Sequence, residues 1–115
     1  MVARLTIPLT IALACAVLAA QAWAASTRSV ALRDNYLTLS SRTAPHGSIT
    51  FNVTNRGLVT HTFDIKRIST GRILFKSRLI SAGGDHISVS RTLRAGRYRL
   101  YCRIHAGMYK IFTVT

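Results

Sequence analysis

The feature that most constrains this chain is a period-two alternation of apolar and polar side chains. In SITFNVTN, residues 48–55, Ile49, Phe51 and Val53 alternate with polar residues. Successive side chains of a β-strand point to opposite faces, whereas the apolar residues of a helix recur about every 3.6 positions. The pattern therefore predicts half-buried strands, and no helical stripe competes with it.

Turn residues divide the alternating region into short strands. The expected strands are 29–33, 36–41, 48–55, 61–68, 72–80, 86–93, 96–102 and 109–115. Turns rich in Gly, Pro, Asn and Asp separate them, as at Ala44–Gly47 and Ala82–Asp85. Seven or eight short strands in about 90 residues predict an all-β fold, an antiparallel β-sandwich. We expect residues 25–28 to be a loose tail.

The N-terminus has the order of an export signal. Arg4 precedes an apolar run over 5–20, and Ala22-Trp23-Ala24 fits a small-residue cleavage site. We therefore expect a signal peptide at residues 1–24, a single domain at 25–115 and a periplasmic location. A retained membrane anchor is the alternative. Lipidation at Cys15 is disfavoured because the apolar run continues past it.

The charge balance is strongly basic. Sixteen Lys and Arg face three acidic residues, giving a formal net charge of +13. Such a charge favours anionic partners, here an acidic redox protein or, more weakly, an anionic membrane surface. Export and the scattered placement of the arginines argue against nucleic acid. A basic surface that only maintains solubility remains an alternative.

Cysteine usage points to the C-terminal region. After removal of residues 1–24 only Cys102 remains. Small exported proteins usually pair their cysteines, so an isolated one indicates an intermolecular disulfide, a buried inert thiol or a metal ligand.

Strand alternation assigns directions to the chemically active side chains. His61 shares a face with Phe63 and Ile65, and Cys102 shares one with Tyr98 and Leu100, so we expect both to point into the core. By the same alternation Thr60, Thr62, Asp64 and Lys66 should point outward. His46 and His86 lie in or beside turns and should be exposed.

The segment CRIHAGM, residues 102–108, places a thiol, an imidazole and a thioether at three-residue intervals. Together with His61 they make a coherent set of four metal donors: His61, Cys102, His105 and Met108. Two imidazoles and a thiolate with a weak axial thioether form a type 1 blue-copper site, which binds one copper ion. Ala106-Gly107 is small enough to turn the chain back and present Met108.

Residues 44–115 resemble the cupredoxins, the small blue copper proteins that include plastocyanin, amicyanin and pseudoazurin. The resemblance is carried by APHGSITFNVTN, THTFDI and GRYRLYCRIHAGMYKIFTVT, with the short C-x2-H-x2-M loop of amicyanin. It implies a Greek-key sandwich with copper at one end. His61, Cys102 and His105 would be strong ligands, Met108 the axial one, and His105 the exposed edge for electrons.

Two features depart from that family pattern. Many members have Asn after the first His, where it braces the ligand loop, but Thr62 stands here. Arg103-Ile104 occupies positions where family loops often carry proline. Arg103 and Lys110 also bring positive charge toward the metal, which we expect to favour Cu(I) and raise the reduction potential.

These features predict a monomeric one-electron carrier that serves acidic redox partners such as a c-type cytochrome, a dehydrogenase or an oxidase. An enzyme is poorly supported, because there are no paired carboxylates and no second copper cluster. The first alternative is a periplasmic copper carrier or storage protein that uses the same ligands without a redox circuit. The second is a metal-free adhesion or assembly module in which Cys102 is only a buried thiol.

Overall fold

A computed structural model describes residues 3, 4, 6 and 24–115 of the chain. The described part is all-β. Its strands are β1 (Ala24–Leu32), β2 (Leu37–Leu39), β3 (Thr43–Ala44), β4 (Gly47–Asn55), β5 (Asp64–Arg67), β6 (Ile73–Lys76), β7 (His86–Leu93), β8 (Gly96–Tyr101) and β9 (Tyr109–Val114). The expected signal peptide at 1–24 lies almost wholly outside the described residues. Among those residues, no helix has the length and apolarity to cross a membrane.

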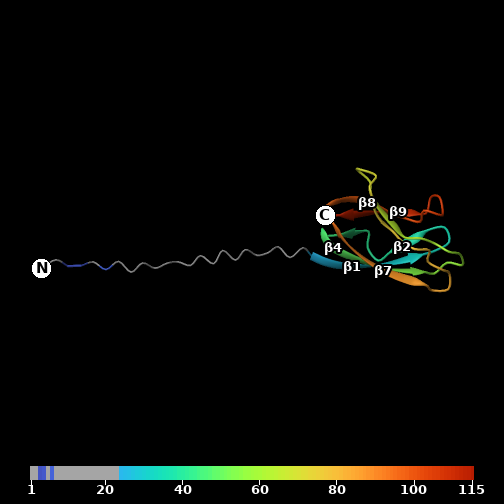
Figure 1. Ribbon diagram of the computed structural model, residues 1–115, viewed down its shortest axis with the longest axis horizontal. Coiled ribbons are helices and arrows are strands. Elements are labelled where there is room, and N and C mark those ends of the chain that lie inside the picture. Colours follow the sequence, from blue (N-terminus) through green and yellow to red (C-terminus); the bar gives the residue numbers. More distant parts are fainter. Residues whose placement is uncertain (1–2, 5, 7–23) are drawn as a thin grey trace.

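The strands form two sheets packed face to face (Figure 1). One sheet has the order β2-β1-β4-β7 and the other β3-β9-β8-β5-β6. The predicted β-sandwich is therefore confirmed. The expectation that every pairing is antiparallel is wrong for two pairs, because β1 runs parallel to β4 and β3 parallel to β9. Side-chain alternation reports which face a residue occupies and carries no information about strand direction.

The first strand begins earlier than the sequence suggests. Residues 25–28 are not a loose tail, since β1 pairs with β4 from Ala24 opposite Gly47 to Leu32 opposite Asn55. The side chain of Arg28 also donates from Nε to the carbonyl of Thr43 at 3.0 Å. The first half of β1 is mostly exposed, so its order comes from backbone pairing with β4 rather than from burial of its side chains.

The core fills the space between the two sheets. Along β4 the residues alternate strictly between buried and more exposed positions, as predicted, and Ile49, Phe51 and Val53 are buried. The ring of Phe51 packs against Phe63 and Phe112 with centroids 5.5 and 5.4 Å apart. Such aromatic contacts between sheets bury large apolar areas and fix the spacing of the layers.

The strand directions give the sandwich two distinct ends. Strand β8 runs from Gly96 to Tyr101, so Cys102 emerges at one end, called here the metal end. Ala24 pairs with Gly47 and Gly47 with Leu93, which places the start of β1 and the β7–β8 turn together at the other end. In Figure 1 the loop after β8 lies at the right and the start of β1 at the left.

Candidate metal centre

His61 is held in place by a single backbone bridge. The residue lies outside the regular strands, and its N–H donates to the Ile80 carbonyl at 3.0 Å while Ile80 donates back at 2.8 Å. The side chain is fully buried, as the sequence predicted. The expected strand over 61–68 in fact begins at Asp64, so His61 occupies a short extended link that is tied to the segment before β7.

The loop from Cys102 to Met108 is closed by its own backbone. The amide of Cys102 donates to the carbonyl of Met108 at 3.0 Å, and the amide of Met108 donates to that of His105 at 3.2 Å. Gly107 has a φ of 80°, which an L-residue adopts only with strain. The small Ala106-Gly107 pair therefore allows the tight turn that the sequence suggested.

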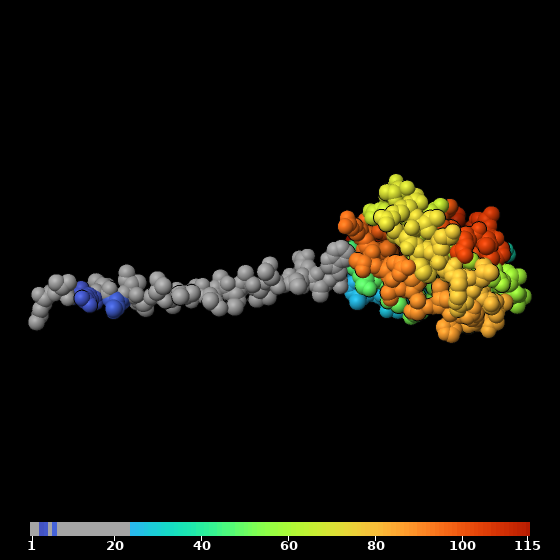
Figure 2. All heavy atoms as spheres, viewed as in Figure 1, coloured from blue at the N-terminus to red at the C-terminus, as the bar shows by residue number. Residues whose placement is uncertain are grey.

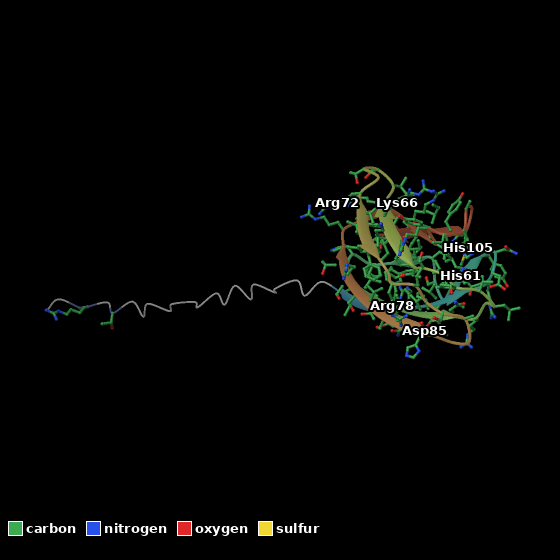
Figure 3. All side chains as sticks on the ribbon, turned by 45° about the vertical axis from the view of Figure 1, so that its right-hand side comes forward. His61, Lys66, Arg72, Arg78, Asp85 and His105 are labelled. Atoms are coloured by element: carbon green, nitrogen blue, oxygen red, sulfur yellow. The ribbon has the colours of Figure 1, made fainter. Side chains whose placement is uncertain are left out.

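The two segments bring three donor atoms together. Nδ1 of His61 lies 3.1 Å from Nδ1 of His105, and Sγ of Cys102 lies 3.9 and 3.4 Å from these two nitrogens. All three atoms are within 4.8 Å of one another, so this group could hold a metal ion. Figure 3 shows His61 and His105 side by side at the metal end.

Met108 is buried beside this group. Its side chain is 2% exposed. It lines a hollow of about 230 Å³ together with Cys102 and His105. The structure thus gathers the whole predicted donor set at one end of the sandwich. His46 and His86 are exposed and lie outside the group, as expected.

Hydrogen-bond donors surround the sulfur of Cys102. Sγ of Cys102 accepts a hydrogen bond from the Thr62 amide at 3.3 Å, and the Thr62 hydroxyl lies 3.7 Å away as a weaker donor. These hydrogen bonds fix the position of the sulfur relative to the two histidines. Among residues 24–115 Cys102 forms no disulfide. A soft sulfur with two imidazoles favours copper over magnesium or calcium.

Thr62 corrects an expectation from the sequence. Strand alternation predicted that it points outward, but it is fully buried. Its hydroxyl accepts from the Arg103 amide at 3.0 Å while it faces the sulfur of Cys102. The alternation fails here because regular pairing starts two residues later. Thr62 thus connects the His61 segment to the ligand loop.

Asp34 is a neighbour of the site that sequence reasoning missed. Its Oδ1 lies 3.2 Å from Nε2 of His61 and accepts from the amides of Leu58 at 2.8 Å and Val59 at 3.3 Å. These backbone hydrogen bonds, together with His61, hold the pKa of Asp34 below its usual range. A carboxylate on Nε2 fixes the imidazole orientation and leaves Nδ1 facing Cys102. In the sequence, Asp34-Asn35 resembles an ordinary turn, and nothing in it indicates that Asp34 contacts a histidine.

The predicted outward orientation of Asp64 is also wrong. The sequence placed it on the outer face, yet it is fully buried and its Oδ1 lies 2.7 Å from Nη1 of Arg103. Burial raises the pKa of this carboxyl, although Arg103 opposes the shift. Arg103 also donates from Nη2 to the Ser77 carbonyl at 2.9 Å. The ion pair therefore clamps the ligand loop to the start of β5.

Comparison with known proteins agrees with this fold. The sequence model of the cupredoxin-like domain family matches residues 5–112. No curated protein sequence matches the chain. Solved structures with the same fold include an auracyanin from Roseiflexus castenholzii, at 19% identity with a TM-score of 0.59, covering 78% of this chain and 96% of that one.

Two further structures have similar scores. A purple cupredoxin from Nitrosopumilus maritimus is 23% identical with a TM-score of 0.56, covering 78% of this chain and 99% of that one. A Cu(I) form of an amicyanin mutant is 18% identical with a TM-score of 0.54, covering 76% and 80%. The described residues thus form a small β-sandwich with a His-Cys-His group at one end. The chain belongs to the cupredoxin-like family.

Proposed function

We propose that this protein is an exported one-electron carrier that holds one type 1 copper ion with His61, Cys102, His105 and Met108. The observation that carries the proposal is the convergence of two imidazole nitrogens and one sulfur within 4.8 Å, beside a buried thioether. Bound copper would supply a Cu(I)/Cu(II) couple. This donor set is typical of electron-transfer sites.

The contribution of the protein is to hold the donors in one arrangement. His61 is bonded on both sides, by the backbone bridge to Ile80 and by Asp34 at Nε2. Cys102 is fixed by its own amide and by Thr62. Donors that cannot move when the charge of the metal changes keep the reorganisation small, which a fast electron carrier requires.

Access for electrons would be through His105, which is partly exposed whereas His61 and Cys102 are buried. Two basic residues, the partly exposed Arg33 and the exposed Arg56, line a hollow of about 500 Å³ that also contains Gly57, next to His61. Lys66 and Arg99 line the hollow that contains His105. Acidic redox partners would therefore meet positive charge around the exposed imidazole, which raises encounter rates at low salt.

We also propose that the working form is the domain at 25–115, exported after removal of residues 1–24. The support is the order of charge, apolar run and small residues at the N-terminus. Mass spectrometry of the protein recovered from the periplasm tests it. A form that retains residue 1 would contradict cleavage.

The metal proposal is tested by adding Cu(II) to the purified metal-free protein. We expect stoichiometric binding and an intense blue thiolate-to-copper absorption band, and Cys102→Ser should abolish this band. His86→Ala, which removes an exposed histidine outside the group, is the matched control and should keep it. An unchanged spectrum in Cys102→Ser would refute the ligand assignment.

Electron transfer is tested separately by stopped-flow reduction of the copper-loaded protein with an acidic c-type cytochrome. We expect fast second-order transfer that slows as the ionic strength rises, because screening weakens the attraction of opposite charges. A protein that binds copper but exchanges electrons slowly with every partner would instead be a copper carrier.

A further inference from the structure

The end of the sandwich opposite the metal end carries a basic cleft that electron transfer does not use. It has a volume of about 640 Å³, and three arginines line it: Arg67, Arg72 and Arg94. Ser69, Thr70 and Thr92 add hydroxyl groups, while Leu74, Leu93 and Tyr98 supply apolar surface. Figure 3 shows Arg72 on the side of the domain away from His61 and His105.

No carboxylate balances these arginines. The three aspartates of residues 24–115 all lie toward the metal end, and each has a partner there. Asp34 contacts His61, Asp64 pairs with Arg103 beside Cys102, and Asp85 pairs with Arg78 just before β7. No acidic residue lines the basic cleft. A threefold positive charge without an internal partner attracts an anion of more than one charge.

One of the three guanidinium groups is already positioned by the protein. Arg67 donates to the Ala95 carbonyl at 3.0 Å and to the Ser69 hydroxyl at 3.1 Å, and it lies over the Tyr98 ring with the guanidinium carbon 5.6 Å from the centroid. All these partners are uncharged, so its positive charge stays available. A fixed, planar guanidinium is well suited to binding phosphate oxygens.

The turn beside the cleft exposes apolar side chains as well. Ile68 and Ile73 flank the β5–β6 turn and are 41% and 48% exposed. This turn projects from the body of the domain (Figure 2, yellow). Arginines next to exposed isoleucines suit a surface with phosphate groups outside and hydrocarbon beneath. A free phosphate ion would bind the arginines but would gain nothing from contact with the exposed isoleucines.

From this combination we infer that the basic cleft and the β5–β6 turn bind the phosphate headgroups of anionic phospholipids, and orient the protein on a membrane with its metal end facing the aqueous phase. Residue 24 lies at the same end as the cleft. It pairs with Gly47 across β1 and β4, and Gly47 pairs with Leu93, which lines the cleft. Membrane attachment there keeps His105 on the far side, available to a soluble partner. The inference does not depend on bound copper.

The test measures binding of the exported, metal-free protein to vesicles by co-sedimentation. We expect binding to vesicles of phosphatidylglycerol mixed with phosphatidylcholine, and none to phosphatidylcholine alone. Each basic residue at an anionic lipid surface contributes about a fivefold gain in binding, so Arg72→Ala/Arg94→Ala should weaken it roughly 25-fold. Arg67 is left unchanged because its side chain also connects the β5–β6 turn, through the Ser69 hydroxyl, to the β7–β8 turn, through the Ala95 carbonyl.

The matched control removes the same charge from the metal end. Arg33→Ala/Arg56→Ala lowers the net charge equally and should weaken binding only about twofold, through the overall field of the protein. Equal losses in the two double variants would mean that net charge alone drives binding, and would overturn the inference. Absence of binding by the unmodified protein would overturn it as well.

Orientation is tested with two exposed isoleucines, one at each end. The only tryptophan of the chain is residue 23, within the segment expected to be removed. Ile68→Trp should show a blue shift of its fluorescence on adding anionic vesicles, whereas Ile104→Trp, 47% exposed in the metal loop, should not. A shift only in Ile104→Trp would overturn the orientation.

Two further measurements test whether the cleft prefers another polyanion to lipid headgroups. Calorimetry with inorganic pyrophosphate, and binding to duplex DNA at equal phosphate concentration, are compared with the vesicles. Lipid binding predicts the strongest association with vesicles. Stronger binding of pyrophosphate or DNA, lost in Arg72→Ala/Arg94→Ala, would assign the cleft to those anions and overturn the lipid inference.

Discussion

The buried pair of Asp64 and Arg103 gives the sharpest test of how the ligand loop is fixed. We predict that Arg103→Met destabilises the metal-free protein, because it leaves a fully buried carboxylate whose Oδ2 already lacks a hydrogen-bond partner. The methionine keeps much of the apolar stem, so the effect reports the charge and its hydrogen bonds rather than lost packing.

The magnitude follows from the burial of the two partners. Removing one member of a buried ion pair costs about 3–5 kcal/mol. Asp64 is fully buried, but the Arg103 side chain is 31% exposed, so water already weakens the pair. We therefore expect a loss of about 2–3 kcal/mol in the free energy of unfolding near pH 7. With a urea m-value of about 1 kcal/mol/M, the unfolding midpoint should fall by about 2–3 M.

The pH dependence identifies the cause. The folded-state pKa of Asp64 is raised by burial, and removing Arg103 takes away the group that opposes this. The folded variant then keeps a proton that the unfolded chain releases above about pH 4, so its stability falls as the pH rises. The destabilisation should be smallest near pH 4 and largest near pH 7.

Urea unfolding followed by circular dichroism at both pH values is the assay, with Arg56→Met as an exposed control that should change stability little. Asp64→Asn/Arg103→Met removes both charges and should regain a large part of the loss, giving a favourable coupling energy in the double-mutant cycle. A loss below about 0.5 kcal/mol, or one that does not vary with pH, would refute the role of the pair.

Three further predictions concern the metal end. Asp64→Asn should raise the reduction potential of the copper-loaded protein, measured by voltammetry, because Arg103 loses its balancing charge; one charge about 10 Å away is worth on the order of 20–70 mV. Gly57→Ala should weaken copper binding in a titration, because its new methyl group would meet Asp34 Oδ1 and lie 2.9 Å from Nε2 of His61. An unchanged affinity would show that the loop gives way. The pKa of Asp85 is lowered chiefly by its hydrogen bonds with Arg78, so this residue stabilises the fold above about pH 4 and less as the pH falls further. Asp85→Asn should therefore flatten the acid limb of the unfolding curve, and an unaltered limb would contradict this.

The sequence predicted those parts of the fold that depend on side-chain alternation. Strand β4 and the inward directions of His61 and Cys102 follow from that rule, and burial confirms them. The parallel pairing of β1 with β4 could not be predicted, because strand direction depends on where distant segments pack. The resemblance to cupredoxins supplied the Greek-key fold and the ligand roles that the spacing alone left open.

The surroundings of the site were harder to predict than its donors. Thr62 was assigned to the outer face because the alternation was extended through residues that precede β5. Asp64 is the first residue of β5 and is buried in its ion pair with Arg103, which alternation does not foresee. Asp34 lies 27 residues before His61, and no local pattern connects the two. Residues that orient a ligand act through hydrogen bonds of precise geometry, which any polar residue of suitable reach can provide. Sequence patterns therefore identify metal ligands better than the groups that position them.

The expected effect of Arg103 on the metal also changes once its partner is known. As an isolated cation next to Cys102 it would raise the reduction potential. Its guanidinium is instead paired with the buried Asp64 at 2.7 Å, so the two charges largely cancel at the distance of the sulfur. Arg78 is neutralised in the same way by Asp85. Because the three carboxylates of the described domain are gathered at the metal end, that end is less positive than the overall charge suggests. The three arginines of the basic cleft, Arg67, Arg72 and Arg94, lie at the opposite end, where they can act on an anionic surface without altering the metal.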